Sequence, residues 1–217
     1  MIAHWDLVQC SREWHELKWG KVGGSSSKGL FVKSDTLLIQ VLSEHIEPFI
    51  YNPDGYVSDD MQRGIDLEPV LQHRMSKFAK VEFKNAGWLQ SERCSLIGIS
   101  PDGITADLTV SYEGKCPQPK KHAETLYLND IPSDNIHQCL HYFTVNEKLE
   151  KHYFASFRPE CDYPLFVKLL TRETPINLGT KAKPVVKEIG EWAELANTEA
   201  LELEANLSLA LQQLDKI

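Results

Sequence analysis

Two short motifs are the most informative part of this chain: Ser100-Pro101-Asp102-Gly103 and Glu113-Gly114-Lys115-Cys116-Pro117. Pro-Asp-Gly is typical of a turn, and residues 104–115 after it are rich in Thr, Val and Tyr, which favour strands. Side chains two residues apart on a strand lie on the same face, so Glu113 and Lys115 are expected to project together. From the preceding turn, Asp102 can reach that face.

This arrangement suits hydrolysis of a phosphodiester. Hard cations such as Mg²⁺ prefer oxygen ligands, which Asp102, Glu113 and the free carbonyl of Gly114 can supply. A bound metal lowers the pKa of a water molecule, and a lysine such as Lys115 can orient that water or stabilise charge. The alternative is purely structural, with Asp102 as a common turn former and Glu113 and Lys115 on a solvated strand edge.

Helix and strand signals intermingle along the rest of the chain, which predicts an α/β fold. We expect a central mixed sheet that carries Asp102, Glu113 and Lys115 and is flanked by helices. Helices are predicted at residues 11–19, 34–46, 58–77, 134–147, 163–171 and 185–217, with caps at Ser11, Ser34 or Asp35, Ser58, and Ser133 or Asp134. Strands are predicted at residues 80–83, 87–90, 96–99, 104–115 and 152–157, and a turn at residues 52–55.

The predicted helix at residues 58–77 has an apolar stripe and an internal proline. Pro69 should kink this helix or remove one of its backbone hydrogen bonds, and Glu68 lies beside it. The stripe is expected to be buried and comprises Ile65, Val70, Leu71, Met75 and Phe78.

The C-terminal helix combines an apolar seam with an acidic outer face. The seam has steps of 4, 3, 4, 3 and 4 residues and consists of Ala196, Ala200, Leu203, Leu207, Ala210 and Leu214. It can pack on its own subunit, on a neighbouring subunit or on a partner protein. We therefore divide the chain into a domain of residues 1–184 and an acidic helix of residues 185–217.

Residues 20–29 are rich in Gly and Ser, with Lys21 and Lys28 at either side. Such a composition usually means a flexible linker, which is the interpretation that this segment favours when taken alone. The alternative is an anion-binding loop, because backbone N–H groups, hydroxyls and flanking lysines suit a phosphate. The segment lacks the spacing of a Walker A motif.

The charge is unevenly distributed. The chain has 23 basic and 31 acidic residues, a net of −8, which on its face disfavours nucleic-acid binding. Residues 188–217 hold seven acids and one base, a net of −6, so the other 187 residues, with 24 acids and 22 bases, carry only −2. A basic groove is therefore possible outside the tail.

The remaining sequence features point to an intracellular protein. No apolar run is long enough to span a membrane, and the first residues do not resemble a secretion signal. Five widely spaced cysteines give no metal-binding or disulfide pattern. An iron–sulfur cluster is not favoured either, because Cys139 and Cys161 are far apart and Cys116 lies in the strand with Glu113 and Lys115.

Five blocks, in order, resemble the lambda exonuclease and YqaJ-like phage recombination nucleases of the PD-(D/E)XK superfamily. Pro101-Asp102 with Glu113-x-Lys115 is the superfamily signature. The resemblance extends over about residues 11–158 through the blocks Trp14-His15-Glu16-Leu17-Lys18-Trp19-Gly20-Lys21-Val22, Arg63-Gly64-Ile65-Asp66-Leu67-Glu68-Pro69, Ile99-Ser100-Pro101-Asp102-Gly103, Glu113-Gly114-Lys115-Cys116-Pro117 and Gln138-Cys139-Leu140-His141-Tyr142.

The resemblance implies a role for each matching residue. Asp102, Glu113 and the Gly114 carbonyl would be metal ligands, Glu68 would complete the acidic cluster, and Lys115 would be the catalytic lysine. Gln138 and Tyr142 would support the lysine and the scissile phosphate. The alternative for Glu68 is an exposed helix carboxylate, and for Gln138 and Tyr142 an ordinary amphipathic helix.

In the family, the N-terminal block captures a 5′-phosphate with an arginine and a following hydroxyl. Lys18 stands at the arginine position and Ser25 at the hydroxyl position. This departs from the family pattern, because lysine cannot offer the bidentate fork of arginine. Preference for a 5′-phosphate and processivity are the properties that this change puts in doubt.

The resemblance further implies a Mg²⁺-dependent exonuclease, with Mn²⁺ as a substitute, that degrades linear duplex DNA from 5′ to 3′ for phage-type recombination. The implied assembly is a homo-trimer that acts on double-stranded DNA ends with a single-strand annealing protein, without a membrane, in the cytoplasm of a bacterial cell. Two alternatives stay open. One is a repair or defence nuclease with a different end preference, and the other is a catalytically weak DNA-binding scaffold.

Overall fold

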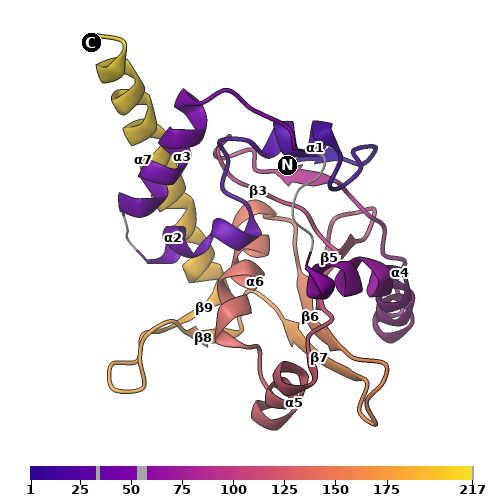
Figure 1. Ribbon diagram of the computed structural model, residues 1–217. Coiled ribbons are helices and arrows are strands. Elements are labelled where there is room, and N and C mark those ends of the chain that lie inside the picture. The colour runs from indigo at the N-terminus through magenta and orange to yellow at the C-terminus, as the bar shows by residue number, and fades with distance from the viewer. Residues whose placement is uncertain (33–34, 53–57, 217) are drawn as a thin grey trace.

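The computed structural model describes residues 1–32, 35–52 and 58–216 (Figure 1). A mixed sheet is flanked by helices, and a long helix closes the chain, which confirms the predicted α/β class. The helices are α1 (Arg12–Lys18), the 3-10 helix η1 (Gly24–Ser26), α2 (Lys28–Phe31), α3 (Asp35–Ile46), α4 (Asp59–Ala79), α5 (Pro119–Leu128), α6 (Ser133–Val145) and α7 (Ile189–Leu214). The strands are β1 (Ile2–His4), β2 (Trp88–Gln90), β3 (Gly98–Ile99), β4 (Gly103–Ile104), β5 (Val110–Lys115), β6 (Lys151–Phe157), β7 (Leu165–Leu170), β8 (Pro175–Asn177) and β9 (Val186–Glu188).

The largest sheet has the strand order β4-β5-β6-β7. Strands β5 and β6 run parallel, with Glu113 opposite Phe154 and Lys115 opposite Ser156, and the other two pairings are antiparallel. A parallel pair needs a crossover connection, and the segment between β5 and β6 contains both α5 and α6. Strand β5 is therefore an interior strand between β4 and β6.

Helix α6 lies at the centre of the molecule. All seven residues from 139 to 145 are buried, so this helix has no solvated face over its second half. It packs against α7, η1, α2, β3 and β6 (Figure 1). Residues on α6 are therefore fixed relative to the sheet, to the N-terminal segment and to the C-terminal helix at once.

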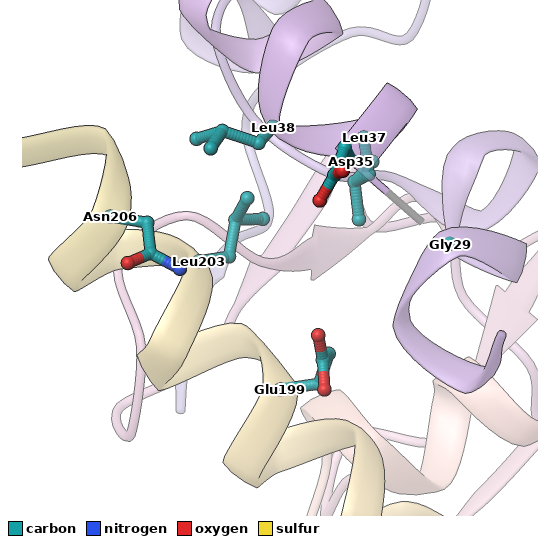
Figure 2. Close-up of a pocket in the computed structure, with 7 residues that line it drawn as sticks. All are labelled: Gly29, Asp35, Leu37, Leu38, Glu199, Leu203 and Asn206. Atoms are coloured by element: carbon teal, nitrogen blue, oxygen red, sulfur yellow. The ribbon is translucent and has the colours of Figure 1, made fainter. Parts of the chain in front are cut away.

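Helix α7 packs on its own chain through the predicted seam. Ala196, Ala200, Leu203 and Leu207 are buried in the main core, while Ala210 is half-buried and Leu214 is exposed. The Cys94 thiol donates a hydrogen bond to the Ala200 carbonyl at 3.4 Å. Figure 2 shows Leu203 and Asn206 of α7 facing Leu37 and Leu38 of α3 across a small pocket of about 240 Å³.

Leu207→Ala should lower the free energy of unfolding by about 2–3 kcal/mol, because it leaves a cavity beside a side chain that is only 4% exposed. Leu209, two residues further on and 56% exposed, offers the matched control. Leu209→Ala should change the free energy of unfolding by less than about 0.5 kcal/mol. Urea denaturation of both variants measures the difference. Equal stability of the two would mean that α7 is not packed on the core in this register.

The prediction of a helix at residues 163–171 is wrong. These residues form β7, which pairs antiparallel with β6 from His152–Leu170 to Phe157–Leu165. A short apolar run does not distinguish a helix from a strand by periodicity alone. Helix α5, which starts with Pro119 at its first turn, was not predicted at all.

Three local predictions also need correction. Residues 80–83 form no strand but a bend after α4, where the Phe83 N–H donates to the Ser76 hydroxyl. Residues 186–188 belong to β9, so the last helix begins only at Ile189. Residues 20–29 are not a flexible linker, since they form η1 and the first half of α2, with Gly23 and Ser27 buried.

The predicted stripe of α4 is only partly buried. Leu71 and Met75 are in the core, but Ile65, Val70 and Phe78 are about half exposed, because α4 lies at the outer edge of the molecule and packs mainly on β5 (Figure 1). The helix runs through Pro69 from Asp59 to Ala79. Residues 34 and 53–55, to which a cap and a turn were assigned, lie outside the described residues.

Within the described part of the chain, no helix is both long enough and apolar enough to cross a membrane.

Candidate active site

Strand β5 brings Glu113 and Lys115 together on one face, as their spacing predicts. The Lys115 ammonium donates a hydrogen bond of 2.5 Å to Glu113 Oε1. The other carboxylate oxygen, Oε2, accepts a hydrogen bond of 2.6 Å from the Tyr142 hydroxyl on α6. Glu113 is only 1% exposed, so both of its oxygens are satisfied by groups that also fix its direction.

Asp102 reaches this site from the turn before β4. Its Oδ2 accepts a hydrogen bond of 2.6 Å from the Gly114 N–H, which lies between Glu113 and Lys115 in the chain. The turn is held by its neighbours, since Gln9 on the N-terminal segment donates to the Pro101 carbonyl at 3.0 Å. The two motifs that stand out in the sequence are therefore in direct contact.

Helix α4 covers the opposite face of β5. A Cβ atom on Gly114 would collide with Leu71 of α4, so the missing side chain allows the helix to approach the strand. Glu68 lies one helical turn before Leu71 and is half-buried. Glu68 therefore projects from the helix that covers Gly114, whose N–H donates to Asp102.

The charges of these groups act on one another. Burial, and then the charge of Glu113, raises the pKa of Asp102 well above its ordinary value, against the smaller effects of Lys115 and the Gly114 N–H. Burial also raises the pKa of Glu68. Burial lowers the pKa of Lys115, but the charges of Glu113 and Asp102 outweigh it, so the lysine stays protonated. The cluster thus holds excess negative charge that one ammonium only partly balances.

The N-terminal block lies beside the same site. A Cβ atom on Gly24 would lie 3.0 Å from the side chain of Gln138, which is one turn of α6 before Tyr142. A Cβ atom on Gly23 would lie 3.8 Å from the Lys18 side chain. The chain of contacts thus runs from Lys18 through residues 23 and 24 to α6.

Lys18 is held in an unusual environment for a lysine. Its ammonium lies 3.5 Å from the centre of the Trp14 ring. Burial lowers the pKa of Lys18 to about 8, partly offset by the charge of Cys10. Ser25 is exposed on η1. A lysine over an indole beside a glycine-rich turn is compatible with an anion-binding role.

A divalent cation fits this donor set. Asp102 and Glu113 supply carboxylates, their mutual repulsion would be relieved by a cation, and the ammonium of Lys115 already occupies one oxygen of Glu113. Among the described residues, no three His, Cys, Asp or Glu side chains lie close enough to hold a metal on their own. The Gly114 carbonyl and water would therefore have to complete the ligand set.

His152 is a supporting residue that the sequence did not point to. Its ring stacks on Tyr142 with 4.1 Å between centres, and its Nδ1 lies 2.9 Å from the Ser111 hydroxyl. His152 is fully buried, and burial lowers its pKa to about 3, so the ring is neutral. It holds the tyrosine that orients Glu113. The pairing of Ser111 with His152 across β5 and β6 depends on a strand register that one sequence does not reveal.

Solved structures resemble this fold. An alkaline exonuclease from Laribacter hongkongensis, LHK-Exo, matches with a TM-score of 0.70 and 21% identity over 95% of this chain and 99% of that one. The same enzyme in complex with dAMP matches with a TM-score of 0.70 and 22% identity over the same shares. A phage-related exonuclease from Haemophilus somnus 129PT gives a TM-score of 0.48 and 12% identity, over 88% of this chain and 96% of that one.

No curated protein matches the chain. The family model of the YqaJ-like viral recombinase domain matches residues 13–148, which is more than half of the 217 residues. The match covers the glycine-rich turn, α4, β5, α6 and all of α1 but its first residue, whereas the supporting residues Gln9 and His152 lie outside it. The chain belongs to the YqaJ-like viral recombinase domain family.

Proposed function

We propose that the chain is a Mg²⁺-dependent exonuclease that degrades linear double-stranded DNA from 5′ to 3′ and leaves single-stranded DNA for phage-type recombination. It is an enzyme of the nuclease class, and its family is a recombinase family. The observation that carries the proposal is the contact network of Asp102, Glu113 and Lys115, supported by the Tyr142 hydroxyl. Mn²⁺ is expected to replace Mg²⁺.

Each residue has a distinct task in this proposal. Asp102, Glu113 and the Gly114 carbonyl hold the cation, and Glu68 contributes through the cation or its waters. The cation, when bound, polarises the phosphate and lowers the pKa of a water molecule. Tyr142 keeps Glu113 in position by donating to Oε2. Gln138, whose side chain lies beside Gly24, supports Lys115 and the phosphate.

Lys115 supplies the fixed positive charge of the site. Lys115 donates to Glu113, and the negative charges of Glu113 and Asp102 raise its pKa, so it stays an ammonium at neutral pH. A protonated lysine can orient the attacking water through its N–H groups and stabilise charge on the phosphate. Because Lys115 donates to Glu113 Oε1, the lysine and the proposed metal ligand Glu113 are positioned together.

A digestion assay tests the activity class. Linear duplex DNA and covalently closed circular duplex DNA of the same sequence are incubated with the protein in Mg²⁺ or in EDTA. We expect the protein to digest the linear DNA in Mg²⁺ but not in EDTA, and to leave the closed circular DNA intact in both. Cutting of the closed circle would show an endonuclease, and digestion in EDTA would contradict the metal site.

Lys18 and Ser25 are proposed to bind the terminal 5′-phosphate. Lys18→Ala should reduce the preference for 5′-phosphorylated over 5′-hydroxyl ends by about tenfold, because a charge-assisted hydrogen bond to phosphate is lost. Initial rates on the two ends give the ratio. Lys21→Ala, three residues further on, serves as control and should keep the ratio. Equal rates on both ends for the unaltered protein would show that this pocket is not used.

The assembly is proposed to be a homo-trimer that encloses duplex DNA and hands its single-stranded product to an annealing protein in the cytoplasm of a bacterial cell. The acids of α7 can then face away from the DNA channel. Light scattering should give a mass of about three times 24.7 kDa. A monomer at micromolar concentration with DNA and Ca²⁺ present would rule out the ring.

A further inference from the structure

The hydroxyl group of Tyr112 on β5 is buried without a hydrogen-bond partner among the residues that the structure describes. Tyr112 is 0% exposed, so this hydroxyl cannot be satisfied by bulk water. Buried polar groups in folded proteins nearly always have a partner, and an orphan points to an ordered water molecule or an ion. Leaving such a group unpaired would cost about 1–3 kcal/mol.

Two glycines place the hydroxyl end of the ring. A Cβ atom on Gly103 would collide with Cε1 of Tyr112, and a Cβ atom on Gly114 would lie 3.3 Å from Cε2. These two ring carbons flank the carbon that bears the hydroxyl. The hydroxyl end therefore lies between the residue that follows Asp102 and the residue that follows Glu113.

Helix α4 encloses this end of the ring from the other side. Leu71 covers Gly114, and Glu68 lies one turn earlier on the same helix. Burial raises the pKa of Tyr112, and the charges of Asp102 and then Glu68 raise it further, ahead of the charge of Glu113. The Asp102 carboxylate accepts from the Gly114 N–H, and Glu68 lies on the helix that covers Gly114, so both acidic residues come to the part of β5 where the Tyr112 ring ends.

We propose that Tyr112 is a positioning residue of the acidic cluster, whose hydroxyl donates a hydrogen bond to a water molecule shared with the carboxylates of Asp102 and Glu68. The role rests on the proposed metal-dependent function. The shared water couples the turn before β4 to helix α4. It keeps both carboxylates directed at one point, so the metal site is formed before the cation arrives.

Tyr112→Phe tests this directly, because it removes the hydroxyl and little else. Titration of the DNA-free protein with Mn²⁺, followed by calorimetry, should show a dissociation constant about tenfold higher than that of the unaltered protein. In a Glu68→Gln background, Tyr112→Phe should raise the dissociation constant for Mn²⁺ by less than about a further twofold, because the Tyr112 hydroxyl and the Glu68 carboxylate act through one water molecule. The coupling between the two variants is a readout that loss of packing would not produce.

Tyr153→Phe is the matched control. Tyr153 is the register partner of Tyr112 on β6 and packs in the same small core cluster, where its ring contacts Phe78. This variant should bind Mn²⁺ like the unaltered protein, because its hydroxyl is not at the acidic cluster.

Two results would overturn the inference in different ways. If Tyr112→Phe binds Mn²⁺ with unchanged affinity and unfolds at a higher temperature, the hydroxyl is an unsatisfied group that only packs. If the unaltered protein binds neither Mn²⁺ nor Mg²⁺, the proposed function fails together with the inference. Weaker Mn²⁺ binding by Tyr112→Phe with unchanged binding by Tyr153→Phe supports the role.

Discussion

Glu113→Gln is expected to lower the rate of DNA hydrolysis by about 1,000-fold. Loss of a charged ligand removes several kcal/mol of transition-state stabilisation by the metal, and each 1.36 kcal/mol corresponds to a factor of ten. The amide has the shape of the carboxylate: its oxygen can still accept from Lys115, and its NH2 group can donate to the hydroxyl oxygen of Tyr142 in place of the bond that Glu113 accepts. The fold should therefore be kept, and the loss should appear in kcat under single-turnover conditions.

The control for this variant is Glu124→Gln, on an exposed face of α5. It should digest DNA at the rate of the unaltered protein. Mn²⁺ titration should also show weaker metal binding for Glu113→Gln alone. If Glu113→Gln retains more than about a tenth of the activity in Mg²⁺, Glu113 is not a metal ligand.

Lys115→Met is the second variant with a large expected effect, about 100- to 1,000-fold on turnover, since a preorganised charge-stabilising donor is lost. It also leaves the buried carboxylate of Glu113 with Tyr142 as its remaining hydrogen-bond donor. An unpaired buried charge should lower the free energy of unfolding by about 1–3 kcal/mol. Ca²⁺ should restore part of this stability, because it replaces the ammonium beside Glu113.

Thermal unfolding with and without Ca²⁺, together with single-turnover rates, measures both effects. Lys151→Met provides the control, since Lys151 is exposed on the neighbouring strand β6. A Lys115→Met variant that digests DNA normally would remove the lysine from the mechanism. One that loses stability equally in Ca²⁺ and EDTA would contradict a shared cation site at Glu113.

The contact between Asp102, Glu113 and Lys115 could be predicted because it depends on local geometry. Residues two apart on a strand lie on the same face, and Asp102 comes directly before β4, which pairs with β5. The family blocks added Glu68, Gln138 and Tyr142, whose proximity comes from helices packed across the sheet. Nothing in the spacing alone would have joined Tyr142 to Glu113.

Strand register and packing explain what could not be predicted. The partners Ser111 and His152 meet only because β5 and β6 pair in one particular register. The orphaned hydroxyl of Tyr112 becomes visible only once α4 covers the strand. Residues 165–170 were misassigned because a six-residue apolar run fits both a helix turn and a buried strand, and the choice is made by pairing with β6.

We propose that the cluster of Asp102, Glu113 and Lys115 hydrolyses DNA from its ends with the help of a metal. The most direct measurement follows release of label from a linear duplex labelled at both 5′ ends, for the unaltered protein and Glu113→Gln, with Mg²⁺ and with EDTA. We expect rapid release of the 5′ label by the unaltered protein in Mg²⁺ and almost none in the other three samples. Release by Glu113→Gln at the rate of the unaltered protein, or by either protein in EDTA, would contradict it.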